Sequence, residues 1–157
     1  MDIKKTIEAF NSLIVINNDR LEGYKVAAET IDDEDLQLFF YRLSQTSGVC
    51  KKELIEEVKK LGGVPDNGTR TAGKFFRVWM EIKAVLSGNN KKVILNLCEC
   101  GEEAALATYK NVLIQEVNEI NSFEQNLLNN HYALLKLDHD KVTKMQIKLR
   151  TEKKMLK

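Results

Sequence analysis

Apolar residues recur along the N-terminal part of the chain at alternating steps of four and three residues. This spacing keeps them on one face of an α-helix and predicts a single long helix from Ile3 to Ile31. Acidic residues at positions 32–35 follow at once and can cap a second helix, whose apolar series runs from Leu36 to Leu61. So short a connection predicts an antiparallel hairpin. The two series are Ile3, Ile7, Phe10, Ile14, Asn17, Leu21, Tyr24, Ala28 and Ile31, then Leu36, Phe39, Leu43, Cys50, Leu54, Val58 and Leu61.

The rest of the chain predicts three further helices. Glycines at positions 62 and 63, followed by Pro65, end the second helix. A short helix is expected over residues 74–86, a long fourth helix over 91–117 and a long fifth helix over 118–150. Their apolar faces are expected to carry, in order, Phe75, Phe76, Trp79 and Ile82; Ile94, Cys98, Ala105, Tyr109 and Val112; and Ile120, Phe123, Leu127, Leu134, Val142, Met145 and Leu149.

The four long helices have similar lengths, so they can lie side by side. Each spans roughly 42 to 48 Å at the helical rise, which the short helix cannot match. Residues 61–90 would then form one long crossover that carries the short helix back along the bundle. We therefore predict an all-α, ferritin-like four-helix bundle built as a single domain over residues 1–157. Val15 and Val26 lie opposite the inward face of the first helix, where the short helix can cover them.

Composition excludes several classes of protein. The chain is 43% hydrophobic and 30% charged with one proline, which excludes a disordered or collagen-like chain. Its 24 basic and 23 acidic residues leave a net charge of +1, so neither nucleic acid nor a membrane is an expected partner. No apolar run is long enough for an export signal or a membrane span. Three cysteines without a paired framework predict a cytoplasmic protein.

A ferritin-like bundle raises the question of a di-iron or di-manganese centre. Such a centre needs a glutamate from each of two helices and a Glu-x-x-His pair from each of the other two. The chain has no Glu-x-x-His pair, because Leu128 and Lys136 stand three places before His131 and His139. At 100° per residue, Glu22 falls on the outer face of its helix. We therefore expect no complete di-iron site and no resident cofactor.

Several polar residues nevertheless fall on the inward faces of the helices. When the helices are aligned at their midpoints, Asn17, Ser47, Glu102, His131 and Asp138 lie within about 6 Å of one level. This polar core layer can be a hydrogen-bonded seam that sets helix register. It can also be a site for iron or manganese, or for a small molecule, or an acid–base site without metal. The candidate ligands in the metal interpretation are Glu53, Glu57, Glu102, His131 and Asp138.

An ordered series of short motifs extends across nearly the whole chain. It includes the heptapeptide at 18–24, the Leu-Gly-Gly-Val-Pro sequence at 61–65, an Arg-x-Trp motif at 77–79 and the Cys-Glu-x-Gly-Glu-Glu-Ala-Ala sequence at 98–105. Together with the His-Asp pair at 139–140, the series resembles a bacterial family of uncharacterised, ferritin-like four-helix-bundle proteins, a domain of unknown function. Family members often have a histidine directly before the arginine of the Arg-x-Trp motif, where this chain has Phe76. The resemblance implies the bundle fold and brings no established activity.

These observations favour a non-enzymatic structural, interaction or stress-associated protein over an enzyme. The alternative is an iron- or manganese-binding redox protein with a non-standard carboxylate and histidine site in the core. Outward apolar residues such as Val15 and Val26 favour a homo-oligomer, and nothing in the sequence names another protein partner. Residues 150–157 form a basic tail, which we expect to fray into solvent.

Overall fold

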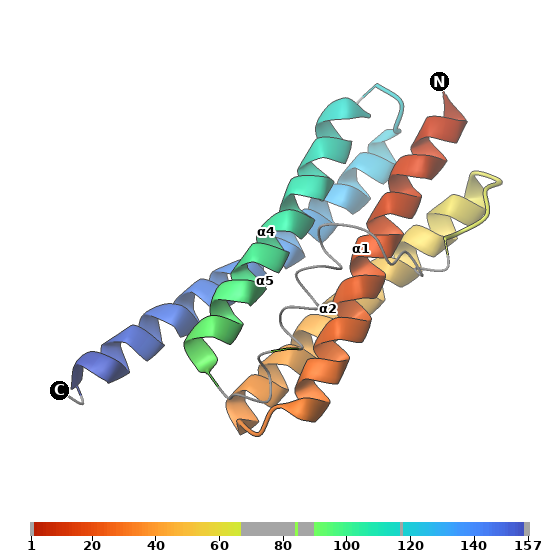
Figure 1. Ribbon diagram of the computed structural model, residues 1–157. Coiled ribbons are helices and arrows are strands. Elements are labelled where there is room, and N and C mark those ends of the chain that lie inside the picture. Colours follow the sequence, from red (N-terminus) through yellow and green to blue (C-terminus); the bar gives the residue numbers. More distant parts are fainter. Residues whose placement is uncertain (1, 67–83, 85–89, 117, 156–157) are drawn as a thin grey trace.

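The computed structural model describes residues 2–66, 84, 90–116 and 118–155. Over these residues the chain forms long α-helices and no strand (Figure 1). Apart from residue 84, the short helix predicted at 74–86 lies outside the described residues, and so does its predicted cover over the first helix. The helices are α1 (Ile3–Thr30), α2 (Glu34–Lys60), α4 (Lys91–Gln115) and α5 (Ser122–Met155).

Local capping explains where these helices begin and where α2 ends. The side chains of Asp2, Asp33 and Asn90 each accept a hydrogen bond from a backbone N–H three residues further on. At the end of α2, Gly62 adopts a left-handed φ of 79°. Its N–H donates to the carbonyl of Lys59, and the next N–H, that of Gly63, donates to the carbonyl of Val58. This is a Schellman motif, which closes the helix with glycine in the left-handed position.

The connectivity follows from two contacts at opposite ends of the bundle. The Lys91 ammonium lies 2.5 Å from a carboxylate oxygen of Asp33, so α4 begins where α2 begins. The Lys60 ammonium lies 5.2 Å from the ring centroid of Phe123, so α2 ends where α5 begins. Helices α2 and α4 therefore point the same way, and α1 and α5 point the other way (Figure 1). The end of α2 and the start of α4 therefore lie at opposite ends of the bundle, as the predicted one-crossover, ferritin-like connectivity requires.

The core is continuous along the bundle, but the inward face of α5 differs from the predicted one. Phe123 and Leu134, which were expected to face inward, are 59% and 40% exposed. Glu124 and Gln146 are buried instead, and hydropathy alone assigns such side chains to solvent. In α1, Val15 is buried although it was expected on the outer face. The buried residues of α5 are Glu124, Leu127, Leu128, His131, Leu135, Asp138, Val142 and Gln146.

The helix ends also correct the prediction in the C-terminal half. Helix α4 ends at Gln115, and α5 begins at Ser122 rather than at 118. The Asn121 side chain accepts a hydrogen bond from the backbone N–H of Glu124 at 2.8 Å, which caps the start of α5. Helix α5 then continues to Met155, so residues 150–155 are helical and not frayed. This end of α5 extends beyond the first turn of α4 (Figure 1).

Candidate functional site

A buried arginine lies at the centre of the bundle and contacts each of the other three described helices. Arg20 of α1 is fully buried. Its Nε and Nη2 donate to the two carboxylate oxygens of Glu102 on α4, at 3.0 and 2.7 Å. Nη2 also lies 3.3 Å from Oδ2 of Asp138 on α5, and Nη1 donates to the Ser47 hydroxyl on α2. We call Arg20, Tyr24, Ser47, Glu102 and Asp138 the arginine cluster.

The charges of the arginine cluster stabilise one another. Burial by itself would lower the pKa of the Arg20 guanidinium, but Glu102, Tyr24 and Asp138 raise it above its usual range. The Tyr24 hydroxyl donates to Glu102 at 2.8 Å, and burial, with the Glu102 charge, raises the pKa of that hydroxyl. Burial also raises the pKa of Asp138, although Arg20 acts against it. Arg20 is thus the fixed counter-ion of two buried carboxylates.

A second polar chain starts at Asn17, one turn before Arg20 on α1, and leads from the core to the surface. The Asn17 Nδ2 group donates to the Leu13 carbonyl at 2.9 Å and to the Tyr109 hydroxyl at 2.8 Å. The Leu13 carbonyl can only accept, so these bonds fix the orientation of the Asn17 amide. The Tyr109 hydroxyl lies 3.0 Å from Nδ1 of His131, and Nε2 of His131 lies 3.4 Å from Oε1 of Glu53. We call Asn17, Tyr109, His131 and Glu53 the histidine chain.

The hydrogen bonds of the histidine chain imply one tautomer for the imidazole. The Tyr109 hydroxyl accepts from Asn17, so its own proton points to Nδ1 of His131, and the imidazole proton lies on Nε2. Burial lowers the pKa of His131, although the charge of Glu53 opposes this shift. The neutral imidazole is therefore the stable form in the folded protein.

The two buried cysteines contact the two buried tyrosines, Cys98 beside Tyr24 and Cys50 beside Tyr109. Burial raises the pKa of the Cys50 thiol to about 12 and raises that of Cys98 further. A thiol reacts as its thiolate, so neither side chain is a nucleophile near neutral pH.

The structure separates the predicted polar core layer into these two groups. Asn17, Glu102, His131 and Asp138 are all buried. Glu102 and Asp138 meet through Arg20, whereas Asn17 and His131 meet through Tyr109. Sequence reasoning missed Arg20 because arginine is usually assigned to the surface. Its position nevertheless indicates an inward side chain, because Arg20 follows Asn17 by three residues and precedes Tyr24 by four on the same helical face.

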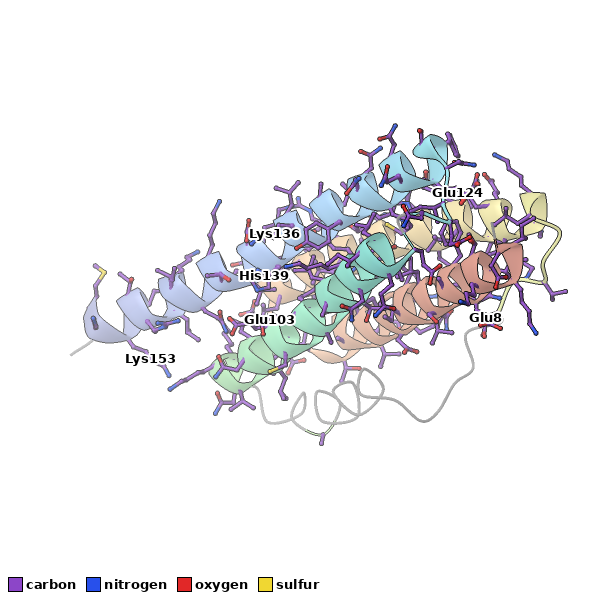
Figure 2. All side chains as sticks on the ribbon, turned by 90° about the horizontal axis from the view of Figure 1, so that it is seen from above. Glu8, Glu103, Glu124, Lys136, His139 and Lys153 are labelled. Atoms are coloured by element: carbon purple, nitrogen blue, oxygen red, sulfur yellow. The ribbon has the colours of Figure 1, made fainter. Side chains whose placement is uncertain are left out.

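The remaining candidate metal ligands are dispersed. Glu53 is about 42% exposed beside His131, and Glu57 is nearly buried with its carboxylate 3.0 Å from the Lys60 ammonium. The second histidine, His139, lies between α4 and α5, with Nε2 3.6 Å from Glu103 (Figure 2). Within the described part of the chain, no three His, Cys, Asp or Glu side chains lie close enough together to hold one metal ion.

Comparison with models of protein families assigns this chain to a family. Residues 5–115 match the family model described as Domain of unknown function (DUF2383). The match covers most of the chain, which therefore belongs to this family. No curated protein sequence matches it. Among the described residues, none of the helices has the length and apolar character that a bilayer crossing requires.

Two solved structures have a similar fold. The first is a crystal structure of ferritin-like, diiron-carboxylate proteins from Bacillus anthracis strain Ames. Its TM-score is 0.74 at 17% sequence identity, and the match covers 93% of this chain and 98% of that chain. The second is a dodecameric thioferritin, the bacterioferritin-related protein of Bacteroides fragilis, with a TM-score of 0.75 at 15% identity over 100% of this chain and 94% of that chain. At these identities the likeness establishes the ferritin-like fold alone.

The core residues of this chain do not fit a dinuclear carboxylate centre. Glu102 and Asp138 are the inward carboxylates at mid-bundle, and both already bind the guanidinium of Arg20. A metal cation at that place would have to displace a buried, permanently charged arginine. The only imidazole in the described core, that of His131, uses both ring nitrogens in the histidine chain.

Proposed function

We propose that this protein is a ferritin-like bundle in which a buried arginine takes the structural place of a metal centre, and that it serves as a structural or interaction protein and not as an enzyme. The observation that carries the proposal is the complete burial of Arg20 between Glu102 and Asp138. In a metal-binding bundle the inward carboxylates are neutralised by metal ions. Here the guanidinium supplies the positive charge.

The buried thiols and tyrosines give the enzymatic interpretation no activated nucleophile. The buried thiols have raised pKa values, and the buried tyrosines also have pKa values above their usual range. Three hollows on the described surface are lined by side chains other than those of the arginine cluster and the histidine chain. Carboxylates such as Glu8 and Asp33 line two of these hollows, but no cysteine or tyrosine is among the described residues that line them.

Metal analysis tests the proposal directly. The protein is purified after growth with added iron or manganese, and its metal content is measured by mass spectrometry together with that of a Glu102→Ala variant. We expect no stoichiometric metal in either protein. Two equivalents per chain in the wild type, lost in Glu102→Ala, would overturn the proposal, because a dinuclear centre would then use this carboxylate.

The alternative function is a single iron or manganese site at the edge of the core. One contact favours it: Glu53 and His131 come from different helices, and their nearest atoms are 3.4 Å apart. These two side chains supply only two ligands, so water would have to complete the coordination. The same metal analysis separates this alternative, since it expects one equivalent that disappears in His131→Ala and persists in Glu102→Ala.

We also propose that the protein self-associates. Leu38, Tyr41 and Val49 share the outer face of α2 and are each more than half exposed. The thioferritin with a similar fold is dodecameric. Sedimentation at several concentrations tests this, with Tyr41→Lys as the disruptive variant and Ile114→Lys, an exposed apolar position on α4, as the matched control. A concentration-independent monomer in the wild type would exclude self-association.

A cytoplasmic location remains our proposal. Cys50 and Cys98 are free and buried, and Cys100 is free and exposed. An exposed free thiol suits a reducing compartment. Fractionation of cells that express the full chain tests the location.

A further inference from the structure

A hollow between α4 and the last turns of α5 is lined by positive charge. It has a volume of about 380 Å³, and none of the described residues that line it is a carboxylate. Lys92 comes from the first turn of α4, and Arg150 and Lys153 come from the C-terminal end of α5. Lys153 lies on the part of α5 that extends beyond α4 (Figure 2). The lining residues are Lys92, Asn96, Gln146, Leu149, Arg150 and Lys153.

Hydrogen-bonding groups form one wall of this hollow. Gln146 is nearly buried, and its Nε2 donates to Oδ1 of Asn96 at 2.9 Å. This bond joins α4 to α5 beneath the three cations and holds the two amides in place. Lys92 also lies in the N-terminal turn of α4, where the helix dipole favours an anion.

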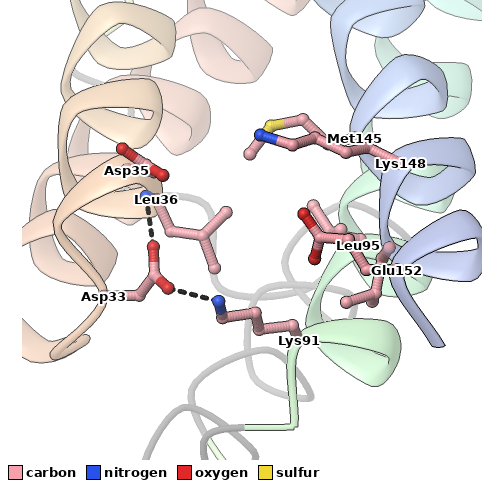
Figure 3. Close-up of a pocket in the computed structure, with 9 residues that line it drawn as sticks. Asp33, Asp35, Leu36, Lys91, Leu95, Met145, Lys148 and Glu152 are labelled. Carbon is pink, nitrogen blue, oxygen red and sulfur yellow. Dashed lines mark hydrogen bonds and ion pairs between the residues drawn. The ribbon is translucent and has the colours of Figure 1, made fainter. Parts of the chain in front are cut away.

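The hollows on the two sides of α5 differ in the charges of the described residues that line them. The hollow on the α2 side, about 280 Å³, has both signs of charge, including Asp33, Asp35 and Glu152 (Figure 3). There the Lys91 ammonium is already paired with Asp33. Lys92, next in sequence, makes no ion pair with any residue that the structure describes, and the same holds for Arg150 and Lys153. The described acidic residues thus leave the three cations of this hollow without an ion-pair partner.

We propose that this hollow binds a small phosphate-bearing anion. Three cations from two helices match the charge of a phosphate ester or diphosphate, and Arg150 can bind two phosphate oxygens at once. Unpaired like charges repel one another, so an anion among them relieves that repulsion. The volume of about 380 Å³ suits a small molecule, and the chain's net charge of +1 gives no broad basic surface for nucleic acid. This site is separate from the arginine cluster and does not depend on the role proposed for that cluster.

Calorimetry with pyrophosphate tests the site on the full chain at constant ionic strength. The variant Arg150→Gln/Lys153→Gln removes two lining charges. The matched control Lys144→Gln/Lys148→Gln removes two exposed charges from the same helix, outside this hollow. We expect saturable binding with a Kd below about 1 mM, weakened at least about tenfold in the first variant and less than about twofold in the control. Circular dichroism verifies that both variants retain the helical fold.

Three outcomes would overturn the assignment. The first is the absence of saturable pyrophosphate binding to the wild-type protein. The second is equal weakening in both double variants, which would mean that diffuse charge attracts the anion. The third is duplex DNA that binds more tightly than pyrophosphate and loses that binding in Arg150→Gln/Lys153→Gln, which would make the surface a nucleic-acid contact.

Discussion

Arg20 and Glu102 meet at the centre of the bundle through two parallel hydrogen bonds of 3.0 and 2.7 Å, and both side chains are fully buried. Two charges with this geometry support each other, but either one alone would be a buried charge without a partner. The pair therefore makes the stability of the bundle sensitive to single substitutions.

The first prediction concerns the loss of the cation. Arg20→Met should lower the free energy of unfolding by about 3–5 kcal/mol, because it leaves the buried carboxylates of Glu102 and Asp138 without their counter-ion. Urea denaturation measures this change. Arg42→Met on the exposed face of α2 is the control and should shift stability by less than about 0.5 kcal/mol.

Removal of the whole ionic group should reverse most of that loss. In Arg20→Met/Glu102→Leu/Asp138→Leu the arginine cluster keeps no charge, so we expect a protein more stable than Arg20→Met alone. If Arg20→Met were as stable as the wild type, the arginine cluster would have no structural role.

The second prediction concerns the tyrosine that supports Glu102. Tyr24→Phe removes a 2.8 Å hydrogen bond to a buried carboxylate and should cost about 1–3 kcal/mol. Tyr41 is 53% exposed, so Tyr41→Phe is the matched control and should be nearly neutral. Thermal unfolding by calorimetry compares the two variants. Equal midpoints would mean that the Tyr24 hydroxyl contributes nothing to Glu102.

The third prediction concerns pH. Burial lowers the pKa of His131 below its unfolded value of 6.5, so the unfolded chain binds the proton more readily. The contribution of His131 to stability should therefore be fully present at about one pH unit or more above that value, and it should decline as the pH drops from about 7.5 to 6. Urea midpoints across this range measure the slope, and His131→Asn should flatten it. An unchanged slope in His131→Asn would assign the effect to another group.

The titration of Asp19 should change stability in the opposite direction to that of His131, at lower pH. Burial raises its pKa from 3.8 to about 6, so the folded chain binds this proton first and gains stability as the pH falls through that interval. Asp19→Asn should therefore make the decline below pH about 6 steeper, which separates the two contributions.

The fourth prediction concerns two glycines whose replacement by alanine should change the free energy of unfolding in opposite directions. Gly62→Ala should destabilise the protein by about 1 kcal/mol, because alanine is strained at a φ of 79°. Gly48 lies within α2, and a Cβ there would meet Leu21 at an ordinary 3.6 Å. Gly48→Ala should therefore stabilise the protein by about 0.5–1 kcal/mol. Chemical denaturation of both variants checks the signs, and the same sign for both would contradict the argument.

The helices and their order were accessible to sequence reasoning, because helical periodicity and capping depend on neighbours within one turn. The caps at Asp33 and Asn90 and the glycine end of α2 have local chemistry that can be recognised without a structure. The similar lengths of the four long predicted helices, and the shortness of the remaining one, then favoured a bundle with one crossover. The inward placement of Glu102 and His131 follows from the same periodicity, since each lies on its helix's apolar face.

The pairing of polar side chains across the core was not accessible in this way. Which groups meet depends on how far each helix is rotated and shifted against the others, and small rotations exchange one partner for another. Arg20 reaches Glu102 and Asp138 from a position that its residue type assigns to solvent, and Tyr109 separates Asn17 from direct contact with His131. These pairings are determined when the helices α1, α2, α4 and α5 pack together, because a buried charge is stable only in an arrangement that brings its partners within reach.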